Sequence, residues 1–260
     1  MARILAITNQ KGGVGKTTTT TNLAASLAAA KQRVLLVDMD PQGNATMGSG
    51  IEKRELPCTV YHLLLGMQTL EQVRCRSEVG QYDVLPANRE LAGAEIELVD
   101  LSEREMRLKD ALQGVSAEYD YVLIDCPPAL NLLTLNGLCA AHAVMIPMQC
   151  EYYALEGLSD LVNTIQKVRA NLNPELEIEG LLRTMFDPRN TLAQQVSQQL
   201  QQHFGDKVYR TVIPRNIRLA EAPSYGLPAL YHDRQSKGAQ AYLALAGELL
   251  NNAPAAQTDT

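Results

Sequence analysis

The amino-acid sequence predicts an α/β protein with a doubly wound, mostly parallel sheet that is flanked by helices. Short apolar runs alternate along the chain with longer segments whose apolar residues recur every three or four positions, as in amphipathic helices. Several of the short runs are continuously apolar, which indicates strands that are buried on both faces of a parallel sheet. The 260 residues are enough for one large domain with a buried core.

The elements follow from these runs in chain order. Strands are predicted for RILAIT (3–8), RVLLVDMD (33–40), YDVLPA (82–87), YDYVLIDCPP (119–128), AVMIPMQ (143–149), EIEGLLRTMF (177–186) and VYRTVIP (208–214). Helices are predicted over residues 17–32, 90–115, 154–172 and 191–205. We expect the apolar face of segment 237–254 to pack on the body of the domain. No repeat or linker is visible, so residues 1–250 are predicted to form a single domain and residues 251–260 a flexible tail.

The composition argues against several classes of protein. No run approaches the roughly 20 apolar residues of a membrane-spanning helix, and polar residues interrupt the apolar start of the chain too early for a secretory signal. The five cysteines form no C-x-x-C pair, and we expect each to be a small buried residue in a reducing, cytoplasmic setting. A net charge of −6 argues against an obligate nucleic-acid coat but is compatible with a local basic patch.

A glycine-rich segment follows the first predicted strand, where ligands bind in such sheets. Its glycines allow the backbone to curl so that its N–H groups face inward, and the helix that starts near Lys16 adds its positive end. We expect Lys16 to reach the β- and γ-phosphates of a nucleotide and the Thr17 hydroxyl to bind Mg²⁺. A dinucleotide loop would need glycine where Thr18 stands. The predicted phosphate loop comprises Gly12, Gly13, Val14, Gly15, Lys16, Thr17 and Thr18.

Acidic residues end two further predicted strands. Asp38 and Asp40 are two positions apart, so both are expected to point to one face of an extended segment beside the phosphate loop. Asp125 follows four apolar residues, as in a Walker B strand whose carboxylate supports Mg²⁺. Two acids near a triphosphate can hold Mg²⁺ through water or orient an attacking water. A strand end without any chemical role is the alternative for each acid, but together they predict a nucleoside-triphosphate hydrolase.

One position of the loop departs from the common pattern G-x-x-x-x-G-K-[ST]. Gln10 stands where the first glycine belongs, and Lys11 follows it, so the loop has a second lysine five residues before Lys16.

The motifs KGGVGKTT, DMDPQGN, YVLIDCPP, PMQCEYYALEGL and VIPRNIRLAEAPS together resemble the deviant Walker A ATPases of the ParA/Soj type, which are P-loop NTPases that partition bacterial chromosomes and plasmids. The resemblance extends to about residue 250. It implies hydrolysis of ATP with Mg²⁺, an ATP-dependent sandwich dimer that binds DNA non-specifically, and a ParB-type centromere-binding partner that stimulates hydrolysis. It also implies a cytoplasmic, nucleoid-associated protein. Because the chain starts at the first predicted strand, without the DNA-reading extension of some plasmid relatives, operator-specific binding is not expected.

The resemblance implies roles for individual residues. Lys11 resembles the signature lysine that reaches the nucleotide of the neighbouring subunit, where a cation supplied in trans couples nucleotide state to dimerisation. Asp40 aligns with the residue that orients the attacking water, whereas Asp38 and Asp125 align with the Mg²⁺ support. Pro214 and Arg215 fall in a segment near the adenine.

DNA binding by an acidic protein requires a local patch. Arg189 and Arg218 match positions that bind DNA in Soj-like proteins, and Arg215 stands beside Arg218, although surface arginines commonly have no such role. Tyr152 and Tyr153 could stack on bases, but a tyrosine pair before a helix is expected to pack into the core.

Three other classes of protein share parts of this pattern. A MinD-like membrane-cycling ATPase would end in a basic amphipathic helix, whereas residues 237–254 contain one lysine. A nitrogenase-iron-protein relative would need glycine-rich cluster loops around its cysteines. A small-molecule ATP-dependent ligase on the same fold would need a substrate pocket instead of a DNA patch. Retention on DNA with ATP but not with ADP distinguishes these classes from a partitioning ATPase.

Overall fold

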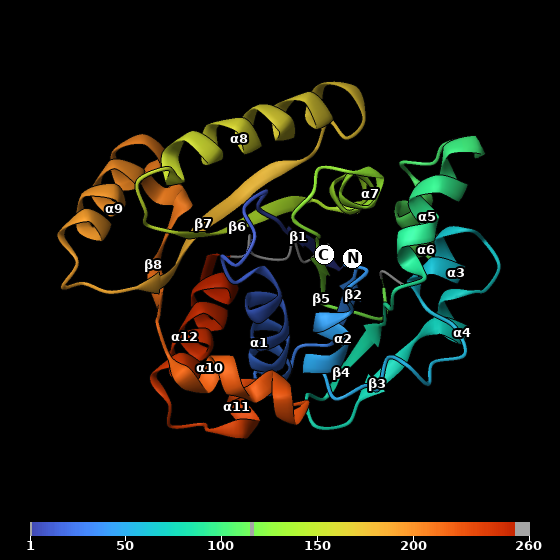
Figure 1. Cartoon of the computed structure of the whole chain (residues 1–260), viewed down its shortest axis with the longest axis horizontal. Helices are drawn as coiled ribbons and strands as arrows, with labels where there is room; N and C mark the ends of the chain where they lie inside the picture. Colours follow the sequence, from blue (N-terminus) through green and yellow to red (C-terminus); the bar gives the residue numbers. More distant parts are fainter. Residues whose placement is uncertain (1, 115–116, 253–260) are drawn as a thin grey trace, which may run out of the picture.

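A computed structural model describes residues 2–114 and 117–252 (Figure 1). Within these residues one sheet has eight strands in the order β3-β4-β2-β5-β1-β6-β7-β8. All neighbouring strands are parallel except the pair β3 and β4. The strands are β1 (Arg3–Ile7), β2 (Val34–Asp38), β3 (Cys75–Ser77), β4 (Tyr82–Leu85), β5 (Tyr121–Asp125), β6 (Ala143–Gln149), β7 (Glu177–Phe186) and β8 (Val208–Pro214). The predicted doubly wound, mostly parallel sheet is therefore confirmed.

The seven predicted strands are all present, with ends within three residues of the prediction. The additional strand β3 is a three-residue edge strand that pairs antiparallel with β4. Its sequence, Cys-Arg-Ser, is too short and too polar to show a strand pattern.

Helices cover both faces of the sheet, as Figure 1 shows, and two hydrophobic clusters fill the two interfaces. One cluster includes residues of α1, α11 and α12, and the other includes residues of α3 and α5 to α9. The α-helices are α1 (Lys16–Ala29), α2 (Asn44–Gly48), α3 (Val60–Leu64), α4 (Leu70–Val73), α5 (Leu91–Glu97), α6 (Arg107–Gln113), α7 (Leu132–Ala140), α8 (Ala154–Asn171), α9 (Thr191–Phe204), α10 (Ile217–Glu221), α11 (Ala229–His232) and α12 (Lys237–Asn252); the 3₁₀ helices are η1 (Leu98–Asp100), η2 (Gly205–Lys207) and η3 (Ala222–Tyr225).

The single helix predicted over residues 90–115 is wrong. The chain forms α5 and η1, turns, and starts α6 at Arg107, and residue 115 lies outside the described residues. Buried Asn136 on α7 explains why the break is stable, because its amide donates to the Arg104 carbonyl and its Oδ1 accepts from the Leu108 amide at 3.1 Å. The side chain thus replaces backbone bonds that a continuous helix would make. Helix α7 itself was not predicted.

The C-terminal helix packs on the body, as expected for segment 237–254. Tyr242, Leu245 and Leu249 of α12 are buried, and the Tyr242 hydroxyl lies 3.1 Å from Thr19 Oγ1 on α1. The helix continues to Asn252, two residues into the predicted tail, and residues 253–260 lie outside the described part of the chain. No helix in residues 2–114 and 117–252 is both long and apolar enough to cross a bilayer.

The prediction of five buried cysteines holds for three of them. Cys126, Cys139 and Cys150 are buried, but Cys75, which belongs to the edge strand β3, and the neighbouring Cys58 are only half-buried. All five are free thiols.

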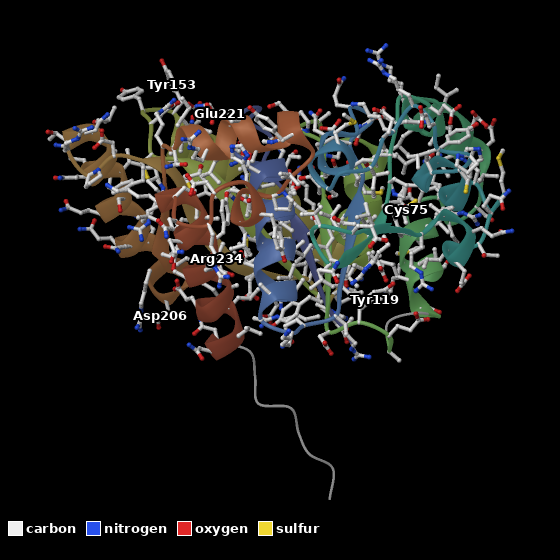
Figure 2. All side chains as sticks on the ribbon, turned by 90° about the horizontal axis from the view of Figure 1, so that it is seen from below. Cys75, Tyr119, Tyr153, Asp206, Glu221 and Arg234 are labelled. Carbon is white, nitrogen blue, oxygen red and sulfur yellow. The ribbon has the colours of Figure 1, made fainter. Side chains whose placement is uncertain are left out.

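The two ends of the parallel strands lie on opposite edges of the molecule. In Figure 2, Tyr153 and Glu221, which follow β6 and β8, lie along one edge, whereas Asp206 and Tyr119, which precede β8 and β5, lie toward the other. The carboxyl ends of the strands, where ligands bind in such sheets, therefore share the edge of Tyr153 and Glu221.

Candidate nucleotide site

The glycine-rich segment forms a tight loop between β1 and α1. Gly13 and Gly15 have φ of 73° and 90°, which only glycine adopts at little cost, and α1 begins at Lys16 as predicted. Gly12 has no positive φ and a Cβ there would meet no atom within 4 Å, so its predicted role does not depend on backbone strain.

Two side-chain bonds fasten this loop to the sheet, and a third braces the loop itself. Asn9 Nδ2 donates to the Pro147 carbonyl at 2.9 Å, and Thr184 Oγ1 donates to the Val14 carbonyl at 2.7 Å. The Asn9 Oδ1 atom accepts from the Lys11 amide at 3.0 Å. The loop is therefore held before any ligand binds, which lowers the entropic cost of binding.

Lys16 lies over the loop and close to the acids of the neighbouring strands. Its Nζ donates to the Lys11 carbonyl at 3.1 Å, and its side chain is buried. Burial lowers the pKa of Lys16, and the nearby charges of Asp125 and Asp40 oppose that shift. A buried ammonium at a helix N-terminus and a glycine-rich loop is suited to a phosphate.

Asp125 positions the hydroxyl that is predicted to bind Mg²⁺. Its Oδ2 accepts from Thr17 Oγ1 at 2.7 Å and its Oδ1 accepts from Thr20 Oγ1 at 3.0 Å. The carboxylate is fully buried, and burial, followed by the charge of Asp38, raises the pKa of Asp125 above its usual range. The hydroxyl that is predicted to bind Mg²⁺ is therefore oriented by a buried carboxylate, and the supporting role of Asp125 stays a prediction.

Asp38 lies beside Asp125 but has a different set of partners. The two residues are paired in the register of β2 and β5. Asp38 Oδ2 accepts from the amide and the hydroxyl of Thr46, each at 2.8 Å, and Oδ1 accepts from the Asp40 amide at 3.1 Å. Burial raises the pKa of Asp38 despite these bonds. Three protein donors already occupy this carboxylate, so it fits a support and not a direct ligand.

Asp40 does not continue the strand, in contrast to the prediction that Asp38 and Asp40 share one strand face. Strand β2 ends at Asp38, and Asp40 starts a turn in which its Oδ1 accepts from the Gln42 amide at 2.9 Å. Asp40 is half-buried where Asp38 is fully buried. The charge of Asp40 acts on Lys16 of the loop, and the turn amide bonds to one of the two Asp40 carboxylate oxygens.

A cavity of about 160 Å³ opens beside the loop, between β7, β8 and α10. Pro214 and Arg215 line it together with Gly15 and Thr18, so the structure brings the predicted adenine segment next to the phosphate loop. Met185 also lines it with φ of 49°, an unfavourable conformation of the kind that occurs at ligand sites. Sequence reasoning missed Met185 and Thr184, although both lie near the end of a predicted strand.

Lys11 lies on the exposed outer side of the loop and pairs with a residue that was not predicted. Its Nζ is 2.6 Å from Glu151 Oε2, and about half of each side chain is exposed. The nearby Tyr152 and Tyr153 are 74% and 70% exposed, so the prediction that they pack into the core is wrong. They precede α8, and that helix buries residues such as Leu158 and Leu161 further along its length.

The two candidate DNA-binding arginines lie at the ends of adjacent strands. Arg189 follows β7 and Arg218 follows β8, whose last residues Phe186 and Pro214 are paired. Both guanidinium groups are bound to acids of this chain, Arg189 to Asp187 at 2.8 Å and Arg218 to the acids Glu221 at 2.9 Å and Asp233 at 3.3 Å. Neither contacts the phosphate loop in the hydrogen bonds and ion pairs of the described residues.

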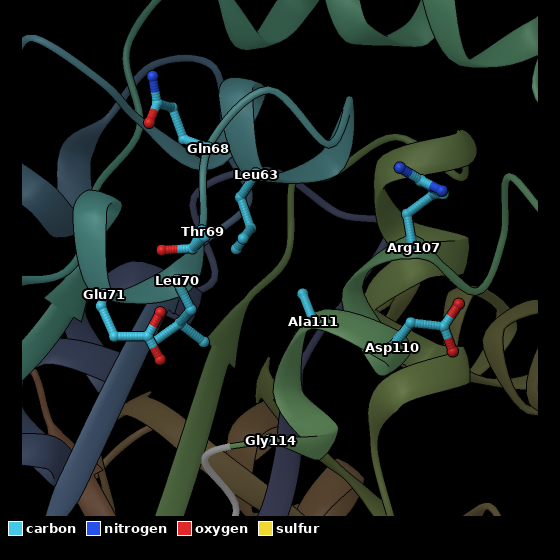
Figure 3. Close-up of a pocket in the computed structure, with 9 residues that line it drawn as sticks. All are labelled: Leu63, Gln68, Thr69, Leu70, Glu71, Arg107, Asp110, Ala111 and Gly114. Carbon is cyan, nitrogen blue, oxygen red and sulfur yellow. The ribbon is translucent and has the colours of Figure 1, made fainter.

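A second cavity, of about 370 Å³, lies between α4 and α6 (Figure 3). It is lined by Leu63, Gln68, Thr69, Leu70, Glu71, Arg107, Asp110, Ala111 and Gly114. None of these lining residues belongs to the predicted nucleotide site.

Comparisons with known proteins show a family and close relatives. A family model described as an AAA domain matches residues 2–178. The chain is 53% identical over 250 residues to the chromosome partitioning protein ParA of Myxococcus xanthus, covering 96% of this chain and 88% of that protein. It is 52% identical over 248 residues to the chromosome-partitioning ATPase Soj of Thermus thermophilus, covering 95% of each.

The fold also matches a solved structure. The crystal structure of cobyrinic acid a,c-diamide synthase from Mycobacterium smegmatis with bound ADP and magnesium has a TM-score of 0.85 and 40% sequence identity, and the match covers 96% of this chain and 95% of that one.

Proposed function

The chain belongs to the ParA/Soj family of partitioning ATPases, and from this premise we propose that it hydrolyses ATP as a Mg²⁺-dependent dimer that binds DNA without sequence preference. A ParB-type partner then stimulates hydrolysis and releases the dimer from DNA. The DNA-bound dimer would in this way hold the cargo that it partitions on the nucleoid. The proposal rests on the arrangement of Lys16, Thr17 and Asp125 around a pre-formed loop.

Different residues of the site would bind the phosphates, the base and Mg²⁺. Backbone amides between Gly12 and Thr18 and the Lys16 ammonium would bind the phosphates, and the cavity beside Pro214 and Arg215 would hold the base. Thr17, oriented by Asp125, would hold Mg²⁺, which prefers oxygen ligands and completes its shell with phosphate and water. When bound, the ion neutralises charge on the phosphates.

Asp40 would orient the attacking water. It is the acid of the cluster that is neither fully buried nor occupied by three donors, and its charge is close enough to affect the pKa of Lys16. Lys11 would complete the site in trans, because it stands on the outer side of the loop with about half of its side chain exposed.

The test measures dimerisation and DNA binding on the same protein. We expect the parent to sediment as a dimer and to bind random-sequence duplex DNA with ATP, but to do neither with ADP. Arg218→Glu should still dimerise with ATP, because Arg218 lies outside the loop, while its DNA binding is nearly lost. Equal DNA binding by the parent and Arg218→Glu at the same salt concentration would show that the DNA surface lies elsewhere or that DNA is not the partner.

A small-molecule ligase is the second candidate, favoured by the similarity to the synthase of M. smegmatis. ATP turnover that depends on a small acid substrate and is indifferent to DNA would support it. A MinD-like membrane cycle has less support, because the apolar face of α12 is buried against the domain.

A further inference from the structure

Two free thiols lie at the same end of helix α4, at the β3 edge of the sheet. The Cys58 thiol donates to the Gln72 carbonyl at 3.0 Å. The Cys75 thiol, whose residue is labelled in Figure 2, lies 3.6 Å from the Val73 carbonyl. These carbonyls belong to the last two residues of α4, so one helix end brings together sulfur atoms from two separate segments.

Backbone bonds hold both cysteines against one short stretch of chain. Cys75 is paired with Val84 in the register of β3 and β4. The amide of Val60, two positions after Cys58, donates to the Pro86 carbonyl at 2.9 Å. Because both anchors lie at the end of β4, a bond between the two sulfur atoms calls for rotation of side chains and not for rearrangement of the sheet. Each thiol gives up only a weak S–H bond to α4.

These two thiols are also the accessible ones. Cys58 and Cys75 are half-buried, whereas Cys126, Cys139 and Cys150 are buried. Burial, followed by the nearby Cys58 thiol, raises the pKa of Cys75. Since the thiolate is the reactive form, Cys75 is the poorer first nucleophile, and Cys58 is expected to react first.

We propose that Cys58 and Cys75 are a reversible oxidation site, at which a low-molecular-weight disulfide such as oxidised glutathione forms a bond between the two sulfur atoms. The Cys58 thiolate attacks one sulfur atom of oxidised glutathione and releases the first glutathione, which takes up the Cys58 proton. The Cys75 thiolate then attacks the Cys58 sulfur of this mixed disulfide and releases the second glutathione, which takes up the Cys75 proton. Two thiols of the chain are oxidised, and one glutathione disulfide is reduced to two glutathione molecules.

The bond would fasten a weak part of the fold. Strand β3 has three residues and pairs on one side only, so this edge is expected to open more easily than the centre of the sheet. A disulfide between Cys58 and Cys75 closes the loop that contains α3 and α4, which restricts the unfolded chain. In a reducing cytoplasm the bond opens again, so it would form only when oxidised glutathione accumulates.

Mass spectrometry of the folded protein, incubated with oxidised glutathione and not reduced afterwards, tests the site. The parent should lose the mass of two hydrogen atoms, carry no glutathione and give a peptide pair joined through Cys58 and Cys75. Cys75→Ser should retain one glutathione at Cys58, because it lacks the thiol that displaces it. Cys58→Ser should react at least about fivefold more slowly, because burial raises the pKa of the remaining thiol.

Urea unfolding measures the effect on stability. The midpoint of the oxidised parent should be about 0.5–1 M higher than that of the reduced parent, and dithiothreitol should reverse the shift. Oxidised glutathione should not raise the midpoint of Cys75→Ser, which is the matched control. Serine keeps a hydroxyl that can donate to the same carbonyl, so both variants are expected to fold, and circular dichroism checks this.

Two results would overturn the inference. If the parent carries glutathione on Cys58 or Cys75 without an internal bond, the two side chains do not meet. If oxidation joins two chains and not two cysteines of one chain, the pair is likewise not an internal site. Either result leaves the proposed function unaffected, because ATP binding, dimerisation with ATP and DNA binding do not enter this test.

Discussion

Threonine hydroxyls hold the two buried carboxylates of the site. Thr17 and Thr20 donate to Asp125, and Thr46 donates to Asp38. These bonds offset part of the cost of burying two acids side by side, although burial still raises the pKa of both. Asp40 lacks such partners apart from one turn amide, which leaves it suited to chemistry and not to support.

Two substitutions at Asp40 test whether this residue has a chemical role and not a supporting one. Asp40→Asn keeps an oxygen that can accept from the Gln42 amide, whereas Asp40→Ala removes it. We expect both variants to bind ATP and to lose hydrolysis by about 100-fold or more, because neither carries a carboxylate to orient water. ATP binding and phosphate release are measured on the same samples. Normal hydrolysis by Asp40→Asn would assign Asp40 to the turn alone.

The strands bring these residues together because their carboxyl ends lie at one edge of the sheet. Strands β1, β2 and β5 are neighbours, and the register that pairs Asp38 with Asp125 also places Ile7, the last residue of β1, beside Asp125. The turn after β2 then needs a special residue. Gly43 has φ of 61°, donates its amide to the Asp40 carbonyl at 2.8 Å and caps α2.

Two glycine substitutions should have opposite effects on stability. A Cβ at Gly43 would lie 2.5 Å from the Ala87 carbonyl oxygen, so Gly43→Ala combines a clash with an unfavourable φ and should lower the free energy of unfolding by about 2–4 kcal/mol. Gly157 lies within α8, and a Cβ there would meet no atom within 4 Å, so Gly157→Ala should raise the free energy of unfolding by about 0.5–1 kcal/mol. Urea unfolding measures both, and equal stabilities would refute the assigned role of Gly43.

The whole molecule carries a net charge of −6, so the proposed DNA binding would depend on how its exposed arginines are arranged. Arg189 and Arg218 each pair with acids of their own chain, which weakens their attraction for phosphate. The proposed dimer would double the set and raise avidity without any new kind of contact. If about four phosphates are neutralised per dimer, log K should fall with log salt at a slope of roughly −3.6.

Removing an acid next to Arg218 should therefore strengthen DNA binding. Glu221→Gln should raise the affinity of the ATP dimer by roughly 2–5-fold at low salt, without changing the salt slope, because the number of phosphate contacts stays the same. Glu118→Gln is a matched control, since Glu118 also binds an arginine, Arg74, at 2.8 Å but lies beside Tyr119, toward the opposite edge. Fluorescence anisotropy on random duplex DNA measures both. An equal gain in the two variants would mean that net charge alone matters.

Local signals in the sequence determined the sheet, the loop and the acids around it. A buried strand, a glycine-rich turn and a helix start are each written in consecutive residues, and parallel strands bring their carboxyl ends to one edge. Lys16, Thr17, Asp38, Asp40 and Asp125 could therefore be assigned to one site before any contact was known, and the structure places them together. The second lysine was equally visible as a departure from the common loop pattern.

The tertiary structure alone decided which partners the side chains have. Glu151 pairs with Lys11, which lies 140 positions away in the sequence. Buried Asn136 stabilises the break before α6, although residues 90–115 have the apolar pattern of one continuous helix. The exposure of Tyr152 and Tyr153 likewise depends on where α8 places its buried face. Such contacts join segments distant in the chain, and their free energies come from burial and pairing that no short stretch of sequence contains.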